Sequence, residues 1–351
     1  MNTKVGILAK HRNLIFVVLG FGIIYSLISL VNHYCFRTYA LDLGVFTNAL
    51  YDYIHFQWND STVFKAVGDN LLADHFDLTL ILFSPLSLIF GTYTLLIVQI
   101  VFILFGGVGV YAYFTLSKKT SSVALFAAFF FYAFFGVAAA LSYDYHSNVI
   151  AATLVPWFFY LIKKNKIWMS AILLLLILVS KENISLWLVF ICFGLAFEYR
   201  KNSHIRNYLI LAAVFSGIYF VFMTSFFMPK ISNNSSYVHF NYDALGNNYH
   251  EAVYYLISHP LAAFKVLFIN HNNDPNGDFV KMELHVLMVI SGLLFLIKKP
   301  QYLFMLIPIY FQKLFNNAPS VWGVGGQYCI EFAPIMAIGV FTVIADLAEI
   351  W

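Results

Sequence analysis

The chain has 351 residues, of which 61% are hydrophobic, 19% aromatic and only 11% charged. Soluble domains carry roughly 45–50% apolar and about 25% charged residues, so the composition excludes a cytosolic enzyme, a disordered chain and a disulfide-stapled secreted domain. The net charge of +3 is too small to indicate a nucleic-acid partner. We therefore expect an all-α, multi-pass membrane protein and read its topology from the positions of the charges.

The first apolar run, Leu14–Val31, is long enough to cross a bilayer, which takes about 20 residues. Three cations precede it and place the N-terminus in the cytoplasm. Residues 32–92 then form a first outer loop. Within this loop the run Leu78–Phe90 is short and contains Pro85, so we expect a re-entrant segment that does not cross.

Nine further apolar runs alternate across the membrane, and most of the Lys and Arg residues fall at their cytoplasmic ends. These runs are Tyr93–Leu116, Val123–Leu141, Val149–Ile162, Ile167–Val179, Ile184–Phe197, Tyr208–Met228, Leu284–Ile297, Tyr302–Phe315 and Tyr328–Ala345. The prediction is a single transmembrane domain over residues 1–351, with ten crossings and both termini inside. A second large outer loop covers residues 229–283, and its part 252–268 is a candidate surface helix.

Ionisable side chains gather on the predicted outer face. Of the 17 Asp and Glu residues, 14 fall outside, as do nine of the 11 His. One interpretation is that the outer loops are simply longer and therefore hold more polar residues. The other is that the chemistry of the protein faces outward from the plasma (inner) membrane.

Asp42 opens the first candidate site. Apolar residues recur near helical spacing over Leu43–Phe56, which predicts an amphipathic helix on the membrane surface. Asp42 stands at its N-terminus, where an Asp side chain serves well as an N-cap. The sequence leaves both roles open, a cap and a catalytic carboxylate.

Two more polar sequence motifs lie outside the spans, one before the re-entrant segment and one between two spans. Asp74 and His75 lie just before the re-entrant segment, where helix capping by Asp74 or Asp77 is the alternative to function. Asp144 and His146 lie in the turn between the third and fourth spans. The sequence leaves two roles open for them, as ligands of a metal or a phosphate and as ordinary turn residues.

The turn Lys181-Glu182-Asn183 joins two runs of only about 14 residues, which rise about 21 Å against a core of about 30 Å. The turn is therefore predicted to lie below the outer water interface. Ionisable groups at such a depth are candidates for function, and the alternative is a self-neutralising structural pair. A cationic Lys181 at this depth suits a lipid-linked phosphate.

Near the last span, a Gly-rich loop leads into Gln327 and Tyr328, which we regard as supporting residues. The three cysteines show no zinc-ligand spacing. Cys35 and Cys329 are both predicted near the outer boundary and could pair, but a small buried residue is the expected role of each.

Taken together, these strings resemble the predicted membrane protein family catalogued as domain of unknown function 2079. The resemblance rests on Tyr39–Tyr51 with its Asp-Leu-Gly, on Asp-His-Phe at 74–76 followed by Pro85, and on the later strings in the expected order. That family in turn resembles the C-type glycosyltransferases. This second resemblance implies a GT-C-like bundle, a large first outer loop with an early acidic residue, and a polyprenyl-phosphate sugar donor that enters from the bilayer.

Asp42 matches that early acidic position, although it is followed by Leu43 where many relatives have Asp-Glu. Many relatives also carry a C-terminal soluble domain, whereas this sequence stops at Trp351, just past the last run. The resemblance implies a base or metal carboxylate at Asp42.

We expect a membrane glycosyltransferase of the cell envelope. Asp42 is the expected catalytic base, and Lys181, His75 and His146 are the expected ligands of the donor phosphate. The expected supporting residues are Asp74, Asp144, Glu182, Asn183, Gln327 and Tyr328. No cofactor is certain. A divalent metal is a candidate, with Asp42, Asp74, His75, Asp144 and His146 as candidate ligands.

The expected partners are membrane lipid, a polyprenyl-phosphate sugar donor and a glycan, lipid or protein acceptor. Two other classes of function stay open. One is a transporter or lipid translocase that uses Lys181 and Glu182 as a relay, and the other is a non-catalytic scaffold of an envelope assembly complex.

Overall fold

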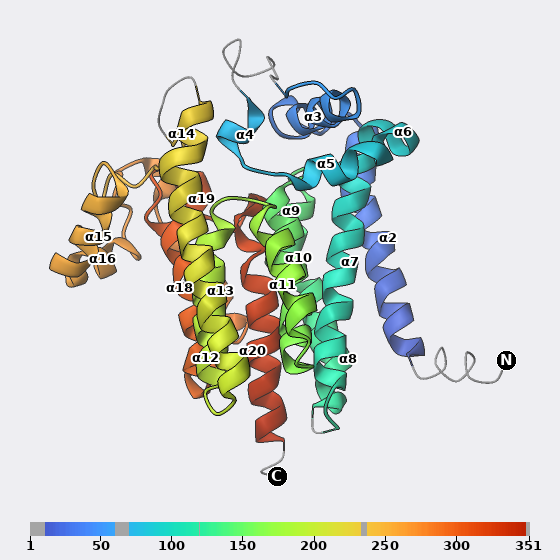
Figure 1. Ribbon diagram of the computed structural model, residues 1–351, viewed down its shortest axis with the longest axis vertical. Helices are drawn as coiled ribbons and strands as arrows, with labels where there is room; N and C mark the ends of the chain where they lie inside the picture. Colours follow the sequence, from blue (N-terminus) through green and yellow to red (C-terminus); the bar gives the residue numbers. More distant parts are fainter. Residues whose placement is uncertain (1–10, 60–69, 119, 233–236, 349–351) are drawn as a thin grey trace.

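The computed structural model describes residues 11–59, 70–118, 120–232 and 237–348. All regular structure in these ranges is helical, without a strand, which confirms the all-α expectation. The helices along the long axis of the molecule (Figure 1) are α2 (Arg12–Tyr34), α7 (Thr94–Thr115), α8 (Ala124–Ala133), α9 (Phe135–Leu141), α10 (Ser147–Lys163), α11 (Ile167–Leu178), α12 (Ile184–Glu198), α13 (Ser203–Phe222), α14 (Met228–Ile231), α18 (Pro300–Leu314) and α20 (Phe332–Leu347).

Several of these helices are suited to a membrane. Three helical stretches in the described ranges are long and apolar enough to cross one, namely Arg12–Tyr34, Thr79–Thr115 and Ser203–Ile231. Two bent pairs of helices raise the number to five. Large apolar side chains such as Leu27 and Leu211 are exposed on α2 and α13, where a soluble protein would expose few.

A layer of short helices lies across one end of the bundle (Figure 1): α3 (Val45–Ile54), α4 (Leu71–Asp74), α5 (Thr79–Phe83) and α6 (Ser87–Phe90). The predicted re-entrant run forms α5, a 3-10 turn and α6, and Gly91 at φ +54° then turns the chain into α7. The apolar residues Phe46 and Leu50 of α3 are buried where α3 packs on α5. The amphipathic face of α3 therefore packs on protein, not on a membrane surface as expected.

Two of the expected spans are broken. The run 123–141 forms α8 and α9, which meet at an extended Phe134 and are bent by 42°. The run 284–297 was expected as one span. It is instead divided between α17 (Val280–Ile290) and a 3-10 stretch (Leu293–Lys298), because Gly292 at φ +94° ends the α-helix.

The second outer loop contains two helices where one was expected, α15 (Tyr249–Ser258) and α16 (Pro260–Val266). Pro260 begins the second, as proline often does because it lacks the N–H that a first turn leaves unpaired. Both helices contribute to a small apolar cluster with Phe315, to one side of the bundle in Figure 1.

Helix α10 forms the centre of the core, since most of its side chains are buried and it packs against α7, α11 and α20. At the end where the site lies, α9 packs closely on the turn Gly326–Cys329 before α20. A Cβ atom at Gly136 would lie 2.3 Å from the carbonyl oxygen of Cys329, so only glycine permits this approach.

Candidate functional site

Asp42 lies in a π-helical turn, Ala40–Gly44, directly before α3. Neither this turn nor α3 has a side-chain cap, so the N-cap interpretation of Asp42 is wrong. Its carboxylate oxygen Oδ1 instead lies 3.4 Å from Nε2 of His146, and a quarter of the Asp42 side chain is exposed. Two residues more than 100 positions apart in the sequence thus form one contact pair, and this pair is partly accessible to solvent.

The turn that carries His146 is held by a glutamine from α7. The Gln99 side chain donates from Nε2 to the carbonyl of Asp144 at 2.7 Å and accepts the N–H of His146 at 3.0 Å. Gln99 is fully buried. Since these bonds satisfy two backbone groups of the turn, Gln99 fixes the position from which His146 reaches Asp42.

Asp144 has a structural role in this turn. It adopts the left-handed conformation at φ +56°, which Asp tolerates better than most residues. Its Oδ2 accepts the N–H of Tyr39 at 2.7 Å. The carboxylate thereby ties the start of the first loop to the turn, which supports the interpretation of Asp144 as a turn residue.

Burial lowers the pKa of His146, and the Lys181 charge lowers it further, whereas the hydrogen bond with Asp42 opposes the shift. The imidazole is therefore neutral at pH 7. Tyr143 stacks on its ring, with 5.7 Å between ring centres. A neutral, fixed imidazole can orient the Asp42 carboxylate and donate one hydrogen bond to it.

Glu182 is the centre of a second group of contacts. Its Oε2 accepts the N–H of Phe76 at 3.1 Å, and its Oε1 accepts the hydroxyl of Tyr237 at 3.0 Å. Nδ1 of His75 lies 3.5 Å from Oε1. Burial opposes ionisation of Glu182, but the contact with His75 and the positive charges nearby outweigh it and lower its pKa to about 2.

His75 and Asp74 meet a residue of the second loop. The ring of His75 stacks on that of His239, with centres 4.3 Å apart and planes within 10°. Nε2 of His239 lies 3.1 Å from Oδ1 of Asp74. The second loop thus reaches the first through residues 237–239, and its start reaches the first loop through α14, which packs on α4.

Lys181 acts electrostatically on residues of both groups of contacts. Its side chain is buried, and within the described ranges it forms no hydrogen bond or ion pair. Burial lowers the pKa of His75 to about 4, and the Lys181 charge contributes to the lowering both there and at His146. The charge of Lys181 therefore acts on both imidazoles and on Glu182, but the described residues show no direct ion pair between Lys181 and Glu182, as a self-neutralising pair would require.

The segment before α5 covers the Lys181 turn. The N–H of Leu78 donates to the carbonyl of Val179 at 2.9 Å. Asp77 accepts hydrogen bonds from the N–H and hydroxyl of Thr79 and from Tyr145. Of the two proposed caps, Asp77 therefore serves as one, whereas α4 is capped by Asn70 and ends at Asp74. Burial raises the pKa of Asp77 to about 7.

The remaining supporting residues lie at the edges of these groups. The carbonyl of Asn183 accepts from Gln312 at 3.4 Å. Asn148 donates to the carbonyl of Gln327 at 3.0 Å and to Glu331 at 3.1 Å. Tyr328 lies beside Gly326 and near Tyr143. The cysteines are all free, and Cys35 is exposed, so neither the Cys35–Cys329 pair nor a buried role for Cys35 is found.

Two residues of these networks, Gln99 and Asn148, were not predicted from the sequence, and Asp77 was considered only as a cap. Gln99 had a usable signal, because a polar amide inside a 22-residue apolar helix needs a partner. The sequence placed Tyr237 and His239 in the second loop but did not indicate their partners, which come from segments more than 50 residues away.

The chain belongs to the predicted membrane protein family DUF2079. The model of this family matches residues 32–351, which include every residue of the two groups of contacts. Neither the curated proteins nor the solved structures contain a match.

Proposed function

We propose that this protein is a membrane glycosyltransferase that transfers a sugar from a polyprenyl-phosphate donor to a glycan, lipid or protein acceptor. The observation that supports the proposal is a partly exposed carboxylate that lies against a buried imidazole, on which the charge of the buried Lys181 also acts. Asp42 lies 3.4 Å from His146, and Lys181 lies close enough to His146 to affect its pKa. Such a set can bind a phosphate and remove a proton beside it.

In the proposed reaction, the acceptor hydroxyl attacks the anomeric carbon while the bond from that carbon to the phosphate oxygen breaks. Asp42 takes the hydroxyl proton as general base, a role that typically contributes 10²–10⁴-fold to the rate. The electron pair of the broken bond remains on the polyprenyl phosphate. Lys181 stabilises that negative charge, because an ammonium held in a partly dry site needs little reorganisation as the charge develops.

The proposed topology has ten crossings, a GT-C-like arrangement and a catalytic face on the outer side of the plasma membrane. It follows the distribution of Lys and Arg along the sequence. On this face, Phe76 and Leu78 before α5 and Tyr237 of the second loop form hydrogen bonds with residues 179–182. In this topology, the turn Lys181-Glu182-Asn183 lies below the outer water interface and is covered by the outer loops.

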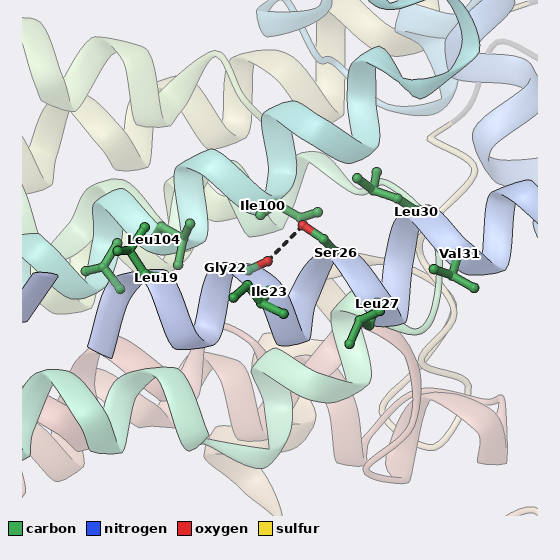
Figure 2. A pocket seen from close by; sticks show the side chains of 10 residues that line it. Leu19, Gly22, Ile23, Ser26, Leu27, Leu30, Val31, Ile100 and Leu104 are labelled. Carbon is green, nitrogen blue, oxygen red and sulfur yellow. Dashed lines mark hydrogen bonds between the residues drawn. The ribbon is translucent and has the colours of Figure 1, made fainter. Parts of the chain in front are cut away.

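A groove between α2 and α7 supplies an apolar surface of the kind that a prenyl tail needs. Its volume is about 570 Å³, and Figure 2 shows Leu27, Leu30 and Ile100 among its lining residues. Its one polar side chain, Ser26, donates to the carbonyl of Gly22 at 2.8 Å. The groove therefore offers hydrocarbon contact without an unsatisfied polar group.

The test is sugar transfer by the full chain in proteoliposomes that contain polyprenyl phosphate carrying a radiolabelled hexose or pentose. We expect Asp42→Asn to lower the rate by about 10²-fold or more, as loss of a general base does. We expect Lys181→Gln to weaken donor use as well. Asp243→Asn, which changes an exposed carboxylate of the second loop, is the matched control. Full activity of Asp42→Asn would overturn the assignment.

A transporter or lipid translocase is the second candidate. The observation that favours it is the pair of bent helices, one bent by 42° and the other by 70°, since transporters build their sites from interrupted helices. Substrate flux that survives Asp42→Asn but is lost in Lys181→Gln would support this candidate over the transferase.

A further inference from the structure

We propose that Asp74, His75 and His239 bind one divalent transition-metal ion, with Zn²⁺ as the best fit, and that this ion fastens the second loop to the first. In the described ranges these three side chains form the only group of at least three His, Cys, Asp or Glu residues whose ligand atoms all lie within 4.8 Å of one another. The proposal is independent of sugar transfer.

The spacing needs only small side-chain movements to become a metal site. Zn²⁺ binds histidine nitrogen at about 2.0–2.1 Å and carboxylate oxygen at about 2.0–2.2 Å, so tetrahedral ligand atoms stand about 3.3 Å apart. Nε2 of His239 and Oδ1 of Asp74 are already 3.1 Å apart. All three side chains are partly exposed, at 21% for His75, 31% for His239 and 29% for Asp74, which leaves room for the rings to turn.

The histidines also have nitrogen atoms without a satisfactory partner. Nδ1 of His75 and Nε2 of His239 are both buried and lack a well-aligned hydrogen bond. Such atoms are rare in folded proteins, and an unseen ion is one physical explanation for them. An ion at the edge of the two rings, in line with the nitrogen lone pairs, would give Nε2 of His239 a partner once the rings turn toward it.

Glu182 fits the role of an outer carboxylate. Metal-binding histidines almost always donate their other ring N–H to a carboxylate, carbonyl or water, which fixes the ring and strengthens the ligand. Here Oε1 of Glu182 lies 3.5 Å from Nδ1 of His75, which leaves Nε2 for the ion. Tyr237 and the N–H of Phe76 hold the carboxylate in place.

The ligand set indicates the class of metal. Two imidazoles and one carboxylate suit Zn²⁺ and neighbouring first-row ions, whereas Mg²⁺ and Ca²⁺ prefer all-oxygen sites. Three protein ligands leave a fourth position for water, as in many zinc sites. The negative charges of Asp74 and Glu182 balance the positive charge of the divalent ion.

The position of the site gives the ion a consequence for the fold. Asp74 is the last residue of α4 and His75 follows it in the first loop, whereas His239 belongs to the second loop. A shared ion cross-links these two loops above the turn of Lys181 and Glu182. Its removal should loosen residues 237–239 more than the helix bundle.

The test is a titration of the purified full chain in detergent micelles with Zn²⁺ alone, after treatment with a chelator. We expect one Zn²⁺ per chain. Asp74→Ala and His239→Ala should abolish binding, and Glu182→Gln should weaken it about 10–100-fold, as loss of an outer partner does. His250→Ala, which removes an exposed histidine of the same second loop, should bind Zn²⁺ as the unchanged chain does.

A second variant guards against misfolding as an explanation. His239→Cys replaces one metal ligand by another, so it should retain Zn²⁺, and Co²⁺ should give it a thiolate charge-transfer band that the unchanged chain lacks. No Zn²⁺ binding at micromolar concentrations would overturn the proposal, as would equal binding by His239→Ala and His250→Ala. Absence of the new Co²⁺ band in a folded His239→Cys would also count against it.

Discussion

Gln99→Leu should destabilise the protein more than the similar size of the two side chains suggests. The substitution removes the donor to the carbonyl of Asp144 and the acceptor for the N–H of His146, at 2.7 and 3.0 Å. Leucine restores neither bond, and the fully buried side chain leaves no room for water to replace them. Both backbone groups of the turn are then buried without a partner.

The magnitude follows from the two orphaned groups. A buried donor or acceptor left unsatisfied costs about 1–3 kcal/mol, so the pair gives a loss of about 2–6 kcal/mol. Gln99→Glu should lie between Leu and the unchanged chain, because a carboxylate accepts the N–H of His146 but repels the carbonyl of Asp144. The ordering of the three proteins is therefore part of the prediction.

The assay is reversible unfolding in mixed detergent micelles, with the free energy of unfolding obtained from the denaturant series. Val101→Leu is the control, because Val101 lies on the exposed side of the same helix and exposed substitutions usually stay within about 0.5 kcal/mol. If Gln99→Leu is no less stable than Val101→Leu, the two bonds do not hold the turn and the account of His146 positioning is wrong.

Three more perturbations follow from single contacts. Gly136→Ala should lose about 1–3 kcal/mol in the same unfolding assay despite its better helix propensity, because its Cβ would lie 2.3 Å from the carbonyl of Cys329. Tyr237→Phe should lose about 1.5–3 kcal/mol, since it removes a hydrogen bond to the ionised Glu182. The pKa of His146 is lowered by burial, so the folded state favours the neutral ring. Its contribution to stability is complete above the unfolded pKa of about 6.5 and is lost as the pH falls below that value, and His146→Gln should flatten this part of the curve of melting temperature against pH.

Each of these has a matched control. Gly20→Ala on α2 places its Cβ in open space and should be neutral or slightly stabilising. Tyr254→Phe changes an exposed tyrosine of α15 and should have little effect. A Gly136→Ala as stable as Gly20→Ala, or a Tyr237→Phe as stable as Tyr254→Phe, would contradict the packing described. A pH curve unchanged by His146→Gln would show that other groups cause the acid sensitivity.

Composition alone determined the class of protein, because no soluble packing can bury so large an apolar excess. The helix boundaries were also largely readable, as α2, α7 and α10 show, since long apolar runs bounded by polar residues leave few alternatives. The break at Gly292 was not predicted. A glycine inside an apolar run does not itself indicate a positive φ.

For the site, the sequence indicated which polar residues stand out, but only the tertiary structure decided their partners. Local patterns offered Asp42 a cap on its own helix, and the fold instead placed it beside His146. They paired Lys181 with its neighbour Glu182, whereas Glu182 is bound by His75 and Tyr237. The physical reason is that helix periodicity reports on neighbours one turn away, while these contacts depend on how distant loops fold over the same end of the bundle.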